Sequence, residues 1–238
     1  MPSVTKLSYF QRIKDSLSIY CHKRVLSLLL LGFSAGLPLM LVFSTLSFWL
    51  REAGVDRTAI GYFSWIALVY GFKWAWSPLV DRMSLPLLTR FLGRRRGWMI
   101  FAQLTLVLAI IGMSQSDPLV DIDKLALFAL MVAFASATQD IVIDAFRIES
   151  ASEKMQAALA AAYQVGYRSA MIIATAGALT IAAWVEPSSE AYSLESWQTA
   201  YLAMAGLMSI GIITTLFSAE PQVEAKEADA KEAELKQK

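Results

Sequence analysis

The chain has 238 residues, of which 56% are hydrophobic and only 17% are charged, and its mean hydropathy is +0.49. A soluble domain is nearer half apolar and a quarter charged, so this surplus of apolar side chains exceeds what a core of this size can bury. The net charge of +1 gives no field that would attract nucleic acid, and a single Cys with a single His excludes a disulfide framework and a Cys/His zinc site. We expect no metal, no cofactor and no nucleic-acid partner.

Six long apolar stretches follow one another along the chain, at residues 25–50, 58–80, 97–115, 125–147, 157–184 and 197–218. Each is about 19 to 28 residues long, and a helix needs about 20 residues to cross the hydrocarbon layer of a membrane. The stretches lack the alternation of barrel strands, and the first is too long to be a cleaved signal peptide. The sequence predicts an all-α integral membrane protein, with a six-transmembrane-helix bundle at residues 25–218.

The segments outside the bundle are polar. Residues 1–24 form a basic arm, and the spacing of apolar residues over 5–20 fits either an interfacial helix or a plain solvated arm. Residues 219–238 form a charged linker. Sixteen of the 21 Lys and Arg residues lie in the arm, the second and fourth loops or the tail. Because an excess of Lys and Arg marks cytoplasmic loops, we expect both termini in the cytoplasm.

The first stretch contains the segment GFSAGLP at residues 32–38. Gly32 and Gly36 lie about one turn apart and allow close approach of another helix, and Pro38 removes one helical hydrogen bond. Tight packing and a moving element both fit this pattern. The fifth stretch has a similar run of small residues at 174–178.

Polar side chains inside the apolar stretches fall close to one depth. At 1.5 Å per residue, most of them lie within about 6 Å of the centre of their stretch, on the cytoplasmic side. Charges inside membrane spans usually face a bundle interior or a water-filled path, so these residues are candidates to line a cavity. Two cations against one carboxylate favour an anionic solute, whereas an ion-pair network that only locks the helices is the alternative. The candidates are Lys73, Gln103, Gln139, Asp140, Gln164 and Arg168.

Asp140, Asp144 and Arg147 share one face of the fourth stretch, because residues three, four or seven positions apart meet on a helix. We predict that Asp140 organises the solute and that Asp144, nearer the cytoplasmic mouth, couples transport to protons. The same two carboxylates could act as the acid and base of a membrane enzyme. No nucleophile or metal partner accompanies them, so we predict that the protein is not an enzyme.

The loop after the second stretch is the densest basic segment, with Arg90 and GRRRG at 93–97 following Asp81 and Arg82. It fits a positive anchor against anionic lipid, or a gate in which Asp81 bonds to a helix end or to a basic group across the bundle. Asp81 and Arg82 are therefore candidate gating residues, together with Gly32, Gly36 and Pro38.

An ordered set of motifs resembles the major facilitator superfamily, and within it the AmpG family of muropeptide permeases. The matching segments are 32–41 (GFSAGLPLML), 50–61 (LREAGVDRTAIG), 72–82 (FKWAWSPLVDR), 93–98 (GRRRGW) and 137–149 (ATQDIVIDAFRIE). The acetyl-CoA transporters have similar motifs. The loop departs from the superfamily signature, since Ser77 stands at the expected glycine and Arg94 follows Asp81 by 13 residues. A latch role therefore fits Asp81 but not the distant arginines.

The resemblance implies a proton-coupled permease that imports anhydro-muropeptides (GlcNAc-anhydroMurNAc peptides) across the bacterial inner membrane for cell-wall recycling. These acidic sugar-peptides suit the cationic layer. Family members have two six-helix halves, so the chain corresponds to the N-terminal half of a major facilitator fold, and we expect it to pair in the lipid bilayer with a second half or another copy of itself. The alternatives are a transporter of another acidic solute such as acetyl-CoA, a non-transporting assembly subunit, and a membrane enzyme that uses Asp140 and Asp144.

Overall fold

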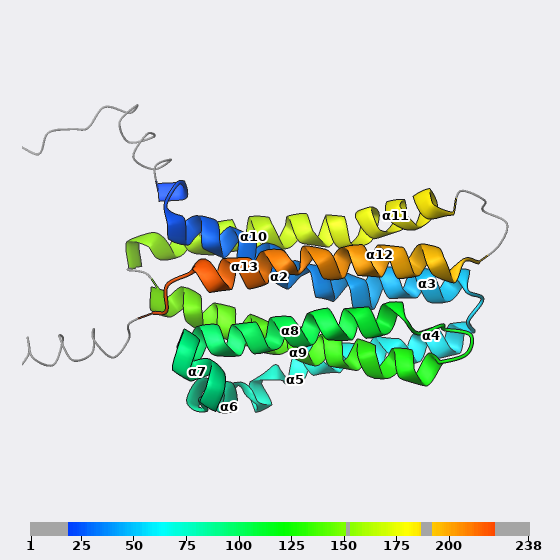
Figure 1. Cartoon of the computed structure of the whole chain (residues 1–238), viewed down its shortest axis with the longest axis horizontal. Helices are drawn as coiled ribbons and strands as arrows, with labels where there is room; N and C mark the ends of the chain where they lie inside the picture. Colours follow the sequence, from blue (N-terminus) through cyan, green and yellow to red (C-terminus); the bar gives the residue numbers. More distant parts are fainter. Residues whose placement is uncertain (1–18, 151–152, 187–191, 222–238) are drawn as a thin grey trace, which may run out of the picture.

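The computed structural model describes residues 19–150, 153–186 and 192–221, and every regular element in these ranges is a helix. The long helices run side by side along one axis (Figure 1). The expected interfacial helix of the N-terminal arm and most of the expected linker lie outside the described residues. The fold class predicted from the sequence, an all-helical membrane bundle, is confirmed.

Five segments are long and apolar enough to cross a membrane, and their bounds lie within a few residues of five predicted stretches. The first segment consists of α2 (Lys23–Met40), a π-helical turn η1 (Leu41–Thr45) and α3 (Leu46–Glu52). The next two are α8 (Arg94–Ser114) and α9 (Ile122–Ser150). The last two combine α10 (Glu153–Ile172), π-helical η4 (Ile173–Gly177) and α11 (Ala178–Val185), and then α12 (Leu194–Leu207) and α13 (Ser209–Phe217).

The second predicted stretch, 58–80, is not one continuous helix. It is divided into α4 (Arg57–Phe63), η2 (Ser64–Ile66), α5 (Ala67–Phe72), η3 (Lys73–Ala75) and α6 (Ser77–Arg82). Pro78 accounts for the last break, because proline has no N–H to donate and its ring crowds the carbonyl four residues earlier. The pieces follow one another along the bundle towards α7 (Pro86–Leu92) (Figure 1). A sixth crossing of the membrane therefore stays a prediction.

The apolar interior consists of two cores, one towards each end of the bundle. One core includes Trp49 and Trp197, which are fully buried and stack with ring centroids 5.9 Å apart. The other includes Leu31, Met99 and Phe146. Along α8 and α9, a buried polar residue separates the positions that belong to the two cores; these residues are Gln103 and Gln139, and Gln139 donates to the buried Ser34 of α2. A polar layer thus divides the apolar core.

The two π-helical turns face each other. η1 begins three residues after Pro38 and contacts η4 of the fifth span. The Thr45 hydroxyl donates to the carbonyl of Ala174 at 2.7 Å, and the Tyr201 hydroxyl donates to the carbonyl of Leu41 at 2.9 Å. These bonds add side-chain donors to carbonyl groups of the irregular backbone and join the first span to η4 and α12.

Glycines bring α2 and α10 into close contact. A Cβ added at Gly32 would overlap the backbone carbonyl of Tyr163, and one at Gly166 would overlap that of Leu29. Gly36 lies equally close to the carbonyl of Tyr167. Gly32 and Gly36 therefore act in packing, as small residues do between membrane helices. The moving element that the same motif could form stays a prediction.

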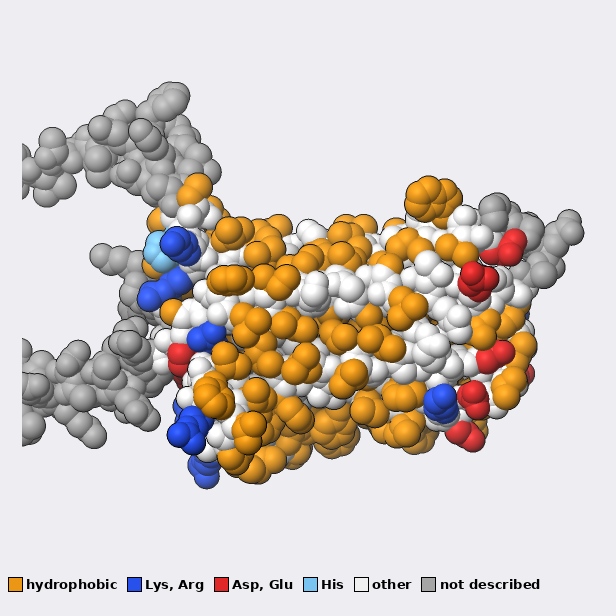
Figure 2. All heavy atoms as spheres, viewed as in Figure 1, with side chains coloured by type: hydrophobic (Ala, Val, Ile, Leu, Met, Phe, Trp, Pro, Cys, Tyr) orange, Lys and Arg blue, Asp and Glu red, His pale blue; other side chains and the backbone are white. Residues whose placement is uncertain are grey.

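Charges are separated between the two ends of the bundle, with a broad apolar belt between them (Figure 2). On the face shown, Lys and Arg gather at the end where α6, α7 and the start of α8 lie, and Asp and Glu dominate the opposite end. The apolar belt matches a hydrocarbon layer, and the basic end matches the side predicted to face the cytoplasm.

The orientation can be tested by cysteine labelling. In a Cys21→Ser background, which leaves no other cysteine, Leu119→Cys and Leu87→Cys place a thiol at each end, on side chains that are 59% and 76% exposed. We expect a membrane-impermeant maleimide applied outside intact cells to label residue 119, and residue 87 only after permeabilisation. Labelling of residue 87 in intact cells would contradict the predicted topology.

Candidate functional site

The predicted mid-depth residues separate into a buried pair and a more open group. Gln103 on α8 and Gln139 on α9 are fully buried in the bundle. The Gln139 side chain donates to Ser34 Oγ at 3.2 Å, and the Thr215 hydroxyl lies 3.1 Å from Gln103 Oε1. Gln103 Nε2 and Gln139 Oε1 have no hydrogen-bond partner among the described residues. These two amides join α2, α8, α9 and α13 and do not lie on an open surface.

Lys73, Asp140 and Tyr163 are three polar residues of the open group that come from three different helices. Asp140 is half-buried on α9, and the Tyr163 hydroxyl on α10 lies 3.5 Å from Asp140 Oδ1, at the limit of a hydrogen bond. Lys73 is half-buried at the start of η3, and η3 contacts α9, the helix that carries Asp140. The break in the second predicted span therefore lies beside the acidic residue of α9. This arrangement offers one carboxylate, one ammonium and one phenol to a polar solute.

Gln164 and Arg168 lie on the exposed side of α10. Arg168 Nη1 lies 3.9 Å from Met171 Sδ, and no ion pair joins Arg168 to Asp140 in the part of the chain that the structure describes. The most apolar window of the α10–α11 segment is only 22% buried, against 44–61% for the other four spans. The expectation that Arg168, Lys73 and Asp140 line one cavity therefore stays a prediction.

Asp144, the residue proposed for proton coupling, is exposed on α9. Its Oδ1 lies 3.3 Å from Arg147 Nη2, three residues further along the same helix. The side chain of Asp144 is 52% exposed, so the pair contributes little to stability. The Asp144 carboxylate is therefore accessible from outside the bundle.

Asp81 does bond to a basic group, and that group is Arg95. Arg95 Nη1 lies 2.7 Å from Asp81 Oδ1, and Arg95 Nε donates to both carboxylate oxygens of Glu149, at 3.1 and 3.0 Å. The Arg95 side chain is 8% exposed. The basic cluster is distant from Asp81 in sequence but not in space, because α7 packs against α8 and brings the start of α8 back to α6. A gating role for Asp81 or Arg95 stays a prediction. Arg82 is exposed, and no ion pair includes it within the described ranges.

Glu220 and Arg96 were not predicted as site residues. The Glu220 carboxylate accepts the backbone N–H groups of Arg95 at 2.7 Å and Arg96 at 3.0 Å, at the start of α8. In return, the Arg96 guanidinium donates to the carbonyls of Thr215 and Leu216, at the end of α13. Gly93 has a φ of +89°, and a Cβ there would overlap the Glu220 side chain, so glycine is required. In the sequence, only the glycine at position 93, directly before a basic segment, indicates a special contact at the start of α8.

The five apolar spans and the basic end of the bundle define the chain as a multi-pass helical membrane protein with polar groups at mid-depth. A sequence model of the family described as acetyl-coenzyme A transporter 1 matches residues 24–237, and the chain belongs to this family of membrane transporters. Membership of a transporter family agrees with the prediction that the protein is not an enzyme.

Similar proteins support the resemblance to the AmpG permeases. Anhydromuropeptide permease of Escherichia coli (strain K12) is 38% identical over 206 residues, which are 86% of this chain and 39% of the permease. Two proteins named putative transporter AmpG 4, from Rickettsia felis and Rickettsia conorii, are 35% and 34% identical over 82% and 84% of this chain and 45% of their own length. The chain therefore spans less than half the length of these relatives.

Proposed function

We propose that the chain is the N-terminal six-helix half of a permease that imports anhydro-muropeptides across the bacterial inner membrane. The observation that carries the proposal is the group formed by Lys73 on η3, Asp140 on the contacting helix α9 and Tyr163 on α10, in a chain 38% identical to an anhydromuropeptide permease. An ammonium and a phenol can bind the carboxylates and hydroxyls of an acidic sugar-peptide. Asp140 can accept from its amides and hydroxyls.

The open side of α10 favours completion of the site by a second half or another copy of the chain. Arg168 is exposed on a span that is apolar overall, and an arginine facing lipid near mid-depth is costly. A partner that covers α10 would remove Arg168 from lipid and enclose Gln164 and Arg168 with the solute. Binding sites at the interface between two halves are common in transporters.

Solute exchange in proteoliposomes tests this function. Protein in vesicles loaded with a GlcNAc-anhydroMurNAc peptide should exchange it, unchanged, for labelled peptide outside. Because a hydrogen bond to a charged group contributes about 1.5–3 kcal/mol, Lys73→Gln and Arg168→Gln should each lower exchange roughly tenfold or more. Arg90→Gln, which removes an exposed cation at the basic end, is the control and should leave exchange unchanged.

Other outcomes would identify the alternatives. Stronger competition by acetyl-CoA than by unlabelled muropeptide would favour the solute that the family description names. Conversion of the peptide into a new product would indicate an enzyme. Absence of exchange by the folded chain joined to its second half would indicate an assembly subunit. Normal exchange by both cation variants would remove Lys73 and Arg168 from the site.

We further propose that Asp144 carries the coupling proton. Asp144→Asn keeps the shape of the protonated carboxyl but cannot release a proton. Exchange down the solute's own gradient should survive in this variant, whereas accumulation driven by a pH gradient should disappear. Asp123→Asn, an exposed acid in the first turn of the same helix, is the control and should keep both activities. Retained accumulation in Asp144→Asn would contradict the assignment.

The gate that we propose lies at the basic end. Arg95 links α6 through Asp81 and α9 through Glu149, and Glu220 links the same turn of α8 to the end of α13. These bonds hold four helices together on the side predicted to be cytoplasmic. Movement of α2 against α10 at Gly32 and Gly36, with Pro38 as a bend, would require this end to open or close with it. Arg82, which is exposed beside Asp81, is available to bind a partner that closes over the gate.

A further inference from the structure

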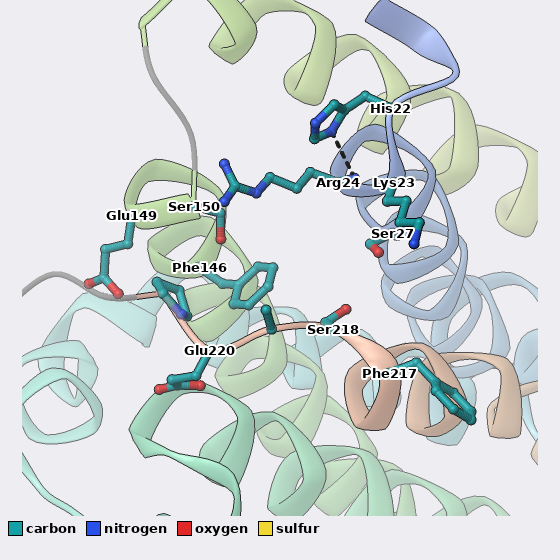
Figure 3. A pocket seen from close by; sticks show the side chains of 12 residues that line it. His22, Lys23, Arg24, Ser27, Phe146, Glu149, Ser150, Phe217, Ser218 and Glu220 are labelled. Atoms are coloured by element: carbon teal, nitrogen blue, oxygen red, sulfur yellow. Dashed lines mark hydrogen bonds between the residues drawn. The ribbon is translucent and has the colours of Figure 1, made fainter.

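We infer that a cavity at the basic end of the bundle binds the phosphate group of an anionic phospholipid. The cavity has a volume of about 520 Å³ and lies between the start of α2, the end of α9 and the residues that follow α13 (Figure 3). It is separate from the mid-depth residues of the proposed solute site. Its polar lining consists of His22, Lys23, Arg24, Ser27, Glu149, Ser150, Ser218 and Glu220.

The cations of the cavity are available to an anion. Lys23 and Arg24 form the first turn of α2, and neither has an ion-pair partner among the described residues. The Arg24 backbone N–H is bonded to His22 Nδ1 at 3.2 Å, the bond drawn in Figure 3, so His22 acts there as a cap that accepts a hydrogen bond. The positive end of the α2 dipole adds to the two side-chain charges.

The two carboxylates of the lining are already engaged by α8. Glu149 receives the Arg95 guanidinium, and Glu220 receives the backbone N–H groups of Arg95 and Arg96. Both carboxylates therefore already accept hydrogen bonds from α8, and neither forms an ion pair with Lys23 or Arg24 among the described residues. Lys23 and Arg24 are thus the cations of the lining that can form an ion pair with an incoming anion.

Ser150 gives an independent reason to place a ligand in this cavity. It is the last residue of α9 and is only 7% exposed, yet its hydroxyl has no hydrogen-bond partner within the described part of the chain. Buried polar groups are nearly always paired, so an orphan hydroxyl in a cavity wall indicates a missing partner. Figure 3 shows the Arg24 side chain extending from α2 towards Ser150. An oxyanion between them would satisfy both groups.

The apolar part of the lining favours a lipid over a free anion. Phe217, at the end of α13, is 88% exposed at the cavity, and the buried Phe146 forms part of the wall. The start of α2, which forms one wall of the cavity, lies at the basic end of the bundle, next to the apolar belt. This is the depth expected for lipid headgroups. Basic pockets between membrane helices on the cytoplasmic side bind acidic lipid headgroups. A phosphodiester at Arg24 would place its acyl chains along Phe217.

Native mass spectrometry of the delipidated protein, titrated with phosphatidylglycerol, tests the inference. Because each basic residue near such a surface contributes about 1 kcal/mol, the double variant Lys23→Gln/Arg24→Gln should weaken binding of one lipid roughly tenfold or more. The matched control Arg90→Gln/Arg94→Gln removes two cations from the same end, outside the cavity, and should change this affinity by less than about twofold. Ser150→Ala should weaken the same binding about threefold. The variant removes the hydrogen bond from the Ser150 hydroxyl to the lipid phosphate, but the exposed Arg24 guanidinium can partly replace that bond.

The probes also separate the sources of the anion. Zwitterionic phosphatidylcholine should bind more weakly than phosphatidylglycerol, and millimolar inorganic phosphate should not displace the lipid. Equal losses in the two double variants would show that only diffuse surface charge attracts the lipid, and would overturn the inference. Displacement of the lipid by inorganic phosphate would show that the cavity binds a free anion, and this result would also overturn the inference. If Lys23→Gln/Arg24→Gln does not fold, an unchanged affinity in folded Ser150→Ala would contradict the site.

Discussion

Replacing Gly32 by alanine is expected to lower the free energy of unfolding by about 3 kcal/mol or more, because the new methyl group would meet backbone and not a flexible side chain. The Cβ would overlap the carbonyl of Tyr163, and α2 and α10 can avoid it only by moving apart along their whole contact. Gly166→Ala, which meets the carbonyl of Leu29, should have an effect of similar size. Unfolding with SDS in mixed micelles measures both.

Gly206→Ala is the matched control for this prediction. Gly206 is an exposed glycine of α12 with open space at the Cβ position, so alanine should stabilise the helix by up to about 1 kcal/mol. If Gly32→Ala were as stable as Gly206→Ala, the tight contact between α2 and α10 would not exist in the folded protein.

Replacing Arg95 by methionine should cost about 3–5 kcal/mol, because it leaves the carboxylate of Glu149 without its partner. Glu149 is the more important of the two acids, since its side chain is 16% exposed and that of Asp81 is 45% exposed. Arg94→Met, at the adjacent position, is the control and should change the free energy of unfolding by no more than about 0.5 kcal/mol. The same SDS titration measures the effect.

A double-mutant cycle separates the network from general destabilisation of α8. Adding Glu149→Gln to Arg95→Met removes the orphan charge, so the double variant should be less destabilised than the sum of the two single variants. Strict additivity would show that Arg95 and Glu149 do not interact in the folded protein. Asp81→Asn should cost much less than Glu149→Gln, because an exposed carboxylate can be solvated.

The continuous spans could be predicted because length and hydropathy alone define them. The segmented second stretch could not, since its composition is as apolar as that of its neighbours and only Pro78 signals a break. The outcome depends on how each short piece packs against α9, and contacts of this kind are not visible in a single stretch.

For the candidate site residues, the sequence predicts how deep in the membrane each side chain lies. It does not predict towards which neighbouring helix the side chain points. Gln103 and Gln139 lie between the two cores, close to the predicted depth, but they point into the bundle and bond to Ser34 and Thr215. Arg95 was overlooked because its partners come from α6 and α9, which are brought together only by the turn through α7. Pairing across three helices requires the tertiary structure.

The hydrogen bonds of Glu220 determine which helices receive a pulling force applied to the chain after residue 221. Because this side chain is attached to the first turn of α8, the chain leaves from beside α8 and not from the tip of α13. A pull on any segment joined after residue 221 is borne first by these two bonds. Arg95 and Arg96 then distribute it to α6, α9 and α13, so that four helices share a force applied at one point.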